Sequence, residues 1–221
     1  SSPVENVQRP KVNNERTRYL TDAERESLLN ACEISHNPDL HLVVLLAIST
    51  GMRKGEIMGM RWQDIHTAPD QSFTRVHLTK TKNGKARSVL LTSPALELLE
   101  DRRTKLMESQ QAKVAAGLVF PSTANVAQPR DLRKPWSAAL QAAGIEEFRF
   151  HDLRHTTASY LAMNGASLLA ISKVLGHKTT KMTERYSHLA TSHIDEVVRS
   201  MNAKKFGPAS KPTPTKGTSE S

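Results

Sequence analysis

The 221-residue sequence is poor in cysteine, in aromatic residues and in long apolar runs. Its single cysteine, Cys32, cannot form an internal disulfide, and one thiol is too few for a zinc ribbon or an iron–sulfur cluster. The longest apolar stretch, residues 40–48, is interrupted by His41 and is far shorter than the roughly 18 residues that a membrane span needs. These absences predict a cytoplasmic protein with no membrane partner.

Acidic residues are also scarce relative to basic ones, 22 against 31, which leaves a formal charge of +9 at pH 7. An excess of this size predicts a polyanionic partner, and nucleic acid is the leading candidate. Hydrophobic residues make up 38% of the chain, which is too many for a wholly disordered protein. Aromatic residues reach only 5%, and we expect Trp62 and Trp136 in the core, which argues against single-strand binding by base stacking.

Polar segments at both ends delimit one folded domain. Residues 1–18 carry four basic residues and two prolines, and this composition predicts a basic linker to a preceding domain. From residue 203 onward the apolar periodicity is lost, which predicts a disordered tail over 203–221. The folded body is therefore expected over residues 19–202.

Helical periodicity dominates this body. Capping residues and apolar spacing predict helices over residues 21–34, 39–50, 54–60, 94–111, 131–144, 152–163, 167–175, 179–188 and 191–202. Residues 73–91 instead alternate with the period of strands around Asn83-Gly84, a strong hairpin signal. The predicted fold class is α+β, mostly α-helical with one small antiparallel β-sheet.

Polar groups that a protein core disfavours gather in four segments, at residues 50–56, 80–84, 151–155 and 175–188. In this order, the segments resemble the landmarks of the catalytic domain of the tyrosine recombinases, the phage integrase family. The resemblance covers about residues 19–198 and implies the fold of that catalytic domain.

The resemblance also implies a site-specific DNA recombinase, or integrase, that integrates or excises a mobile element in the bacterial cytosol or nucleoid. Its partner would be double-stranded DNA, on which chains that are monomers without DNA assemble as a homo-tetramer. Strands would be cut and rejoined through a 3′-phosphotyrosyl ester that conserves the bond energy, so no ATP, metal or other cofactor is implied. Residues 1–18 would lead to a missing N-terminal core-binding domain, and 19–202 would be the catalytic domain.

Cutting DNA with a side-chain oxygen requires a cation for the phosphodiester, a base for the nucleophile and an acid for the departing 5′ oxygen. A guanidinium donates two parallel hydrogen bonds to phosphate and stays charged, and the resemblance assigns this clamp to Arg53 and Arg154. It assigns the nucleophile to Tyr186. A tyrosine with a pKa of about 10 needs cationic neighbours and a proton acceptor.

Two histidines are candidates for that acceptor, and the sequence leaves the choice open. His151 stands three residues before Arg154 on the expected helix, and His177 stands nine residues before Tyr186, a spacing common in the family. Glu56, three residues after Arg53, is expected to support that arginine rather than act as a base. The resemblance assigns the general acid to Lys82 at the hairpin tip.

Other basic residues have weaker assignments. Lys80 and Lys85 are alternatives to Lys82, or they contact phosphate and only tune affinity. His155 is expected to pack or to hydrogen-bond to the backbone, and no direct role is assigned to His188. Residues that either face DNA or carry solvated charge are Arg130, Arg133 and Lys134. A stripe at helical spacing, which suits a neighbouring protomer or the same domain equally well, comprises Ile194, Val197, Val198 and Met201.

Three rival classes share part of this pattern. A type IB topoisomerase uses the same tyrosine, arginine, lysine and histidine chemistry, but relaxes supercoils as a monomer without exchanging strands between sites. A plain DNA-binding module explains the charge alone. His151 and His155, four residues apart, resemble a zinc protease motif, but aspartate replaces its glutamate and no third ligand is placed.

Overall fold

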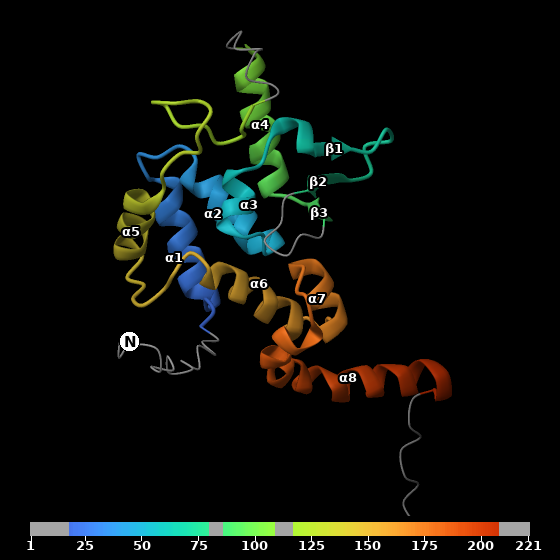
Figure 1. The fold of residues 1–221 in the computed structure, drawn as a ribbon. Helices are drawn as coiled ribbons and strands as arrows, with labels where there is room; N and C mark the ends of the chain where they lie inside the picture. The colour runs from blue at the N-terminus through green and yellow to red at the C-terminus, as the bar shows by residue number, and fades with distance from the viewer. Residues whose placement is uncertain (1–17, 80–85, 109–116, 208–221) are drawn as a thin grey trace, which may run out of the picture.

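The computed structural model describes residues 18–79, 86–108 and 117–207, in which one small sheet lies at one side of a group of helices (Figure 1). The helices are α1 (Asp22–Glu33), α2 (Leu40–Thr50), α3 (Lys54–Met58), α4 (Ala95–Glu108), α5 (Arg133–Ala142), α6 (Asp152–Met163), α7 (Leu168–Leu175) and α8 (Ser187–Phe206). Short 3-10 turns are η1 (Trp62–Asp64), η3 (Thr180–Met182) and η4 (Glu184–Tyr186). Within the described ranges, no helix is long and apolar enough to cross a membrane.

The sheet has three antiparallel strands in the order β1 (Ile65–Thr67), β2 (Thr74–Leu78) and β3 (Arg87–Leu91). Strands β2 and β3 form the predicted hairpin, and Val76 pairs with Val89 on the face turned to the core. Strand β1 was not predicted, because three residues are too few to show alternation. The predicted α+β class, mostly helical with one small antiparallel sheet, is confirmed.

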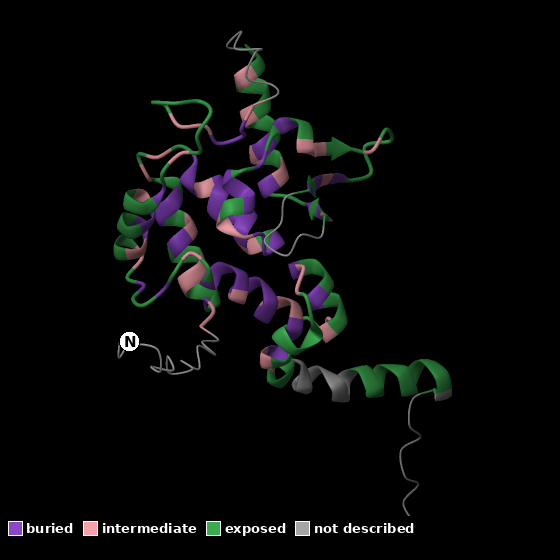
Figure 2. Ribbon diagram, in the orientation of Figure 1, coloured by how far each residue is buried: buried purple, intermediate pink, exposed green. Residues whose placement is uncertain are grey.

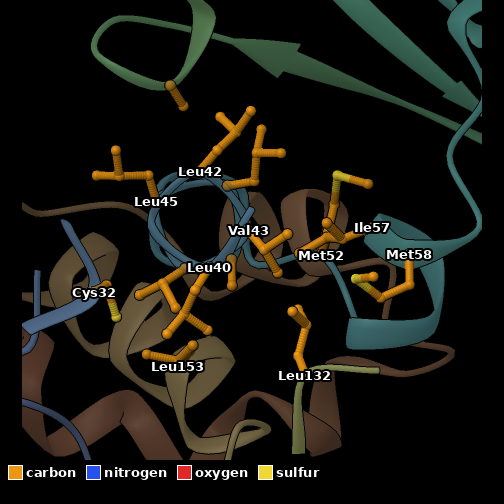
Figure 3. Packing of buried hydrophobic residues seen from close by; sticks show 14 of the residues in the cluster. Cys32, Leu40, Leu42, Val43, Leu45, Met52, Ile57, Met58, Leu132 and Leu153 are labelled. Atoms are coloured by element: carbon orange, nitrogen blue, oxygen red, sulfur yellow. The ribbon is translucent and has the colours of Figure 1, made fainter. Parts of the chain in front are cut away.

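Helix α2 forms the centre of the main hydrophobic core. It is apolar on nearly every side, and Figure 3 shows side chains such as Leu40, Leu42, Val43 and Leu45 leaving its axis in different directions. Helices α1, α4 and α6 and strand β3 pack around it. This burial on all sides gives a rigid centre from which the short α3 and the following turn are positioned.

Helix α6 connects this core to a second, smaller cluster. The Thr157 hydroxyl donates to the carbonyl oxygens of Ala47 (3.1 Å) and Ile48 (2.8 Å), which ties α6 to the end of α2. The second cluster joins α6, α7 and η4, and its buried members are Ala158, Ala162, Ile171, Leu175 and Tyr186. Tyr186 is therefore held by packing against α6 and α7, away from the main core.

The chain after α7 differs from the prediction. The expected helix over 179–188 is absent, and two 3-10 turns, η3 and η4, occupy this stretch. Thr179 has an extended backbone (φ −137°, ψ 152°), and the hydroxyl of the buried Thr183 bonds to Nδ1 of His177. Threonine side chains that bond locally compete with helix formation, which explains the irregular stretch.

Helix α8 begins directly after Tyr186 and continues to Phe206, past the boundary expected at 202. Nothing between 188 and 191 breaks a helix, so the expected interruption does not occur. The outer part of α8 projects from the rest of the domain and is exposed (Figures 1 and 2). Lys82, the Asn83-Gly84 turn and residues 1–17 and 208–221 lie outside the described residues.

Candidate active site

A close approach of two helix ends creates the site. Helix α2 ends at Gly51, whose backbone is left-handed (φ 65°). A Cβ atom at this position would lie 2.4 Å from Cδ2 of Leu175 and 3.3 Å from Cγ2 of Thr157. Only glycine permits this contact without displacement, so the end of α7 packs against the end of α2 beside α6. Arg53, two residues after Gly51, is thereby brought beside the end of α7.

Arg53 and Glu56 face one another across the first turn of α3. Arg53 caps this helix with an extended backbone, and its amide N–H donates to Oε2 of Glu56 (2.8 Å). Its Nη1 donates to Oε1 of Glu56 (3.0 Å). The contact predicted from their three-residue spacing is therefore present, and the two remaining guanidinium nitrogens of Arg53 have no partner within the described ranges.

Arg87, which the sequence analysis did not single out, is the second partner of Glu56. Its two Nη atoms donate to Oε1 and Oε2 of Glu56, both at 2.9 Å. A local signal for this role exists in the sequence. Arg87 lies on the same face of β3 as Val89 and Leu91, and a charged residue on the buried face of a strand needs a partner.

Arg154 lies deeper, with 4% of its surface exposed. Its Nη1 donates to the carbonyl oxygen of Gly51 (2.6 Å) and its Nη2 to that of Leu175 (2.5 Å). Burial, and then the charges of Arg53 and Arg87, lower the pKa of Arg154 to about 9, so it remains protonated at neutral pH. The helix ends that Gly51 brings together are thus bridged by a buried cation.

Tyr186 is 2% exposed, and its hydroxyl lies 2.5 Å from Nδ1 of His155. Burial raises the pKa of Tyr186 to about 12. Burial, and then the neighbouring His151, lower the pKa of His155 to about 4. His155 is therefore neutral at pH 7, and its Nδ1 can accept a hydrogen bond from the Tyr186 hydroxyl.

The expectation that His155 only packs or bonds to the backbone is therefore wrong. The contact depends on where η4 meets α6, residues that are 31 positions apart, so no local pattern reveals it. His151 stands at the exposed start of α6, with its ring edge-on to that of His155 at 5.4 Å between centroids.

His177 follows the end of α7 and stands nine residues before Tyr186 in the sequence. Its Nδ1 is 2.8 Å from the hydroxyl of Thr183. Burial, and then the charges of Arg154 and Arg53, lower the pKa of His177 to about 4. The structure thus brings Arg53, Arg154 and His177 into one electropositive region, whereas Lys82 lies outside the described residues.

Most of the remaining residues singled out in the sequence are paired or buried. Arg130 pairs with the fully buried Asp39 (Nε to Oδ2, 2.7 Å), so it is not a free DNA-facing charge. Arg133 pairs with Asp131 on the surface (2.7 Å). Trp62, Trp136 and Cys32 are buried, as expected. No three His, Cys, Asp or Glu side chains of the described ranges gather as a metal site would require.

Comparisons with known proteins agree with this arrangement. The family model described as the phage integrase family matches residues 18–193. The chain is 31% identical over 207 residues to the integrase of Salmonella phage P22, covering 91% of this chain and 51% of that protein. It is 34% identical over 190 residues to the shufflon-specific DNA recombinase of Escherichia coli, covering 86% and 44% respectively. The chain spans about half the length of the curated relatives it matches.

Solved structures give the same result. The catalytic domain of bacteriophage HP1 integrase is 28% identical, with a TM-score of 0.60 over 88% of this chain and 98% of that one. The fold is also similar to that of XerH site-specific recombinase bound to palindromic difH substrate, with 22% identity and a TM-score of 0.68. The match over most of its length, together with these relatives, shows that the chain belongs to the phage integrase family.

Proposed function

We propose that this chain is the catalytic part of a tyrosine-type site-specific DNA recombinase that cuts and rejoins double-stranded DNA. The observation that carries the proposal is the charge arrangement around Glu56. The guanidinium groups of Arg53 and Arg87 bond to this carboxylate, and the buried Arg154 lies close enough to feel the charges of all three groups. Three guanidinium groups with one carboxylate leave an excess of positive charge near Tyr186, which suits binding of a phosphodiester.

Arg53 is the residue best placed to meet this phosphate directly. Its side chain is 17% exposed, and only one of its three guanidinium nitrogens is used by Glu56. Arg154 is proposed to act through its charge from a more buried position, because its two Nη atoms already bond to the carbonyl oxygens of Gly51 and Leu175. Both charges would stabilise the negative charge that accumulates on the non-bridging oxygens in the transition state.

In the proposed reaction, the Tyr186 oxygen attacks phosphorus, and the bond from phosphorus to the 5′ oxygen breaks. The product is a 3′-phosphotyrosyl ester and a free 5′ hydroxyl, and the tyrosine proton passes to a neutral histidine. His155 already contacts the hydroxyl, whereas His151 and His177, the candidates from sequence, contact other groups. A 5′ hydroxyl of a partner duplex then attacks the ester, which regenerates the phosphodiester and free Tyr186.

Several parts of the proposal extend beyond the described residues. Lys82 is the proposed acid that protonates the departing 5′ oxygen. The reaction conserves the bond energy in the ester, so we propose that it proceeds without ATP, metal or another cofactor. Residues 1–18 are the proposed linker to a core-binding domain, without which we expect this chain to bind DNA weakly and with little specificity.

The proposed assembly is a homo-tetramer on synaptic DNA, formed from chains that are monomers without DNA and act in the cytoplasm. Support comes from α8, where Val197, Val198 and Met201 of the expected stripe are exposed and do not pack on their own domain. An exposed apolar stripe of this kind suits contact with a neighbouring protomer. No membrane partner is proposed.

The polarity of cleavage tests the proposed chemistry. The substrate is a duplex that carries the candidate element's end sequence and a nick shortly downstream of the scissile phosphate. Cleavage then releases the short 5′-hydroxyl fragment between the scissile phosphate and the nick, and its loss by diffusion traps the cut strand on the protein. The strand is labelled either upstream or downstream of the scissile phosphate. We expect the upstream label to become protein-linked, and the released fragment to accept phosphate directly from polynucleotide kinase. A released fragment with a 5′ phosphate, or a protein link to the downstream label, would contradict the proposal.

A second assay separates a recombinase from a type IB topoisomerase. The trapped complex is offered a second duplex with a 5′-hydroxyl end, either of the matched site sequence or of unrelated sequence. A recombinase should join the matched duplex preferentially. Relaxation of supercoiled plasmid of any sequence, without joining between duplexes, would favour the topoisomerase.

A further inference from the structure

Glu56 is shared unequally between two arginines. Arg87 occupies both of its oxygens in a bidentate pair at 2.9 Å, the strongest geometry available to a guanidinium and a carboxylate. Arg53 adds a single side-chain bond from Nη1 and one from its amide. Burial alone would raise the pKa of Glu56, but hydrogen bonds from Arg87 and Arg53 lower it overall, so the carboxylate is charged and fully engaged.

Arg87 also lies against the turn that precedes His177. A Cβ atom at Gly176 would lie 2.9 Å from Cδ and 3.0 Å from Nη1 of Arg87. Gly176 has a left-handed backbone (φ 64°) as it ends α7. The Arg87 side chain is therefore confined between this turn and Glu56, and only 11% of it is exposed.

We propose that Arg87 is a positioning residue that keeps Glu56 engaged and thereby leaves the outer face of the Arg53 guanidinium free for the scissile phosphate. The inference rests on the proposed function. Its physical reason is competition for one buried carboxylate. Without Arg87, Glu56 would face Arg53 alone, and a bidentate pair between these two would turn the Arg53 nitrogens away from the phosphate.

The placement of β3 does not depend on Arg87. Val89 and Leu91 anchor the strand in the core, and five residue pairs join it to β2. A substitution at Arg87 should therefore change the orientation of Arg53 more than the fold. Arg75 offers a matched control, because it is an arginine on the adjacent strand β2 that points to the opposite face of the sheet and contacts Phe73.

The test is single-turnover cleavage of nicked duplexes whose scissile phosphate is the Rp or the Sp phosphorothioate. Each diastereomer places sulfur at one non-bridging position, so the ratio of the two rates reports which oxygen Arg53 contacts. We expect Arg87→Met to slow cleavage of the normal phosphate on the order of 10- to 100-fold at saturating DNA, and to change the diastereomer ratio at least about threefold. Arg75→Met should leave both rates and their ratio unchanged.

A second substitution makes the competition argument falsifiable even if Arg87→Met lowers the folded fraction. Glu56→Gln removes the charge that would capture Arg53, so Arg87→Met/Glu56→Gln should cleave faster than Arg87→Met alone. Arg87→Lys should not restore cleavage, since an ammonium lacks the planar fork that donates two parallel hydrogen bonds to the carboxylate.

Two results would overturn the inference while leaving the proposed function intact. One is an unchanged diastereomer ratio with both rates falling in proportion to the folded protein measured by circular dichroism. The other is a double variant no faster than Arg87→Met. A wild-type chain that forms no protein-linked DNA on the normal phosphate would instead refute the proposed function, and the role of Arg87 with it.

Discussion

Replacing His155 by leucine should destabilise the domain and expose how the nucleophile is held before DNA arrives. The Tyr186 hydroxyl is buried in a side chain that is 2% exposed, and its partner is Nδ1 of His155 at 2.5 Å. Leucine keeps much of the volume but offers no acceptor. A buried hydroxyl left without a partner costs about 1–3 kcal/mol, so we expect the free energy of unfolding to fall by that amount.

Removing the other partner of this hydrogen bond should lower the free energy of unfolding by less. Tyr186→Phe removes the hydroxyl and leaves the ring nitrogen of the half-buried His155 without this partner, so we expect a loss of about 0.5–1.5 kcal/mol. The double variant His155→Leu/Tyr186→Phe removes both polar groups, and its loss should fall short of the sum by about 1 kcal/mol.

Urea unfolding followed by circular dichroism measures all three free energies. The matched control is His188→Leu, an exposed histidine on the first turn of α8, which should change stability by no more than about 0.5 kcal/mol. Additive losses in the double variant, or a His155→Leu cost equal to that of the control, would show that the contact does not hold Tyr186.

Two further predictions concern the histidines and the helix junction. His155 and His177 have folded pKa values of about 4, below the usual 6.5, so the unfolded chain binds protons first as pH falls. Their contribution to stability is fully present above pH 6.5 and is lost as the pH falls from 6.5 to about 4. Urea unfolding at a series of pH values should show this fall in the free energy of unfolding, and His177→Gln should reduce it. A free energy that does not change over this pH range would contradict the prediction. Gly51→Ala should lower the melting temperature by more than a surface substitution does, because its left-handed backbone costs about 1–2 kcal/mol for alanine and its Cβ would lie 2.4 Å from Cδ2 of Leu175. An unchanged melting temperature would show that the two helix ends can separate without cost.

Local signals predicted much of the fold. The capping box of Thr21 and Glu24 begins α1, and left-handed glycines end α2 and α7 at Gly51 and Gly176. These features depend on a few adjacent residues, so they can be read from the sequence alone. The stretch between Gly176 and α8 was predicted wrongly, because the bond between His177 and Thr183 outweighs helical spacing there.

The contacts of the candidate site also differ in whether local sequence could predict them. Arg53 and Glu56 are three residues apart, so their contact follows from helix geometry. Arg87 joins Glu56 from a different element, although its place on the buried face of β3 could have indicated a partner. The contact of His155 with Tyr186 needs α6 and η4 to be packed together, and only the tertiary structure contains that information.

Trapping of a covalent protein–DNA adduct tests the central claim most directly. The chain is incubated in chelator with nicked duplexes carrying the candidate element's end sequences, denatured in detergent, and examined for DNA that migrates with protein, with Tyr186→Phe in parallel. We predict an adduct that forms without divalent metal and is absent from Tyr186→Phe. An equal yield of adduct from Tyr186→Phe, or no adduct from a wild-type chain that binds the same DNA, would contradict the assignment of Tyr186 as the nucleophile.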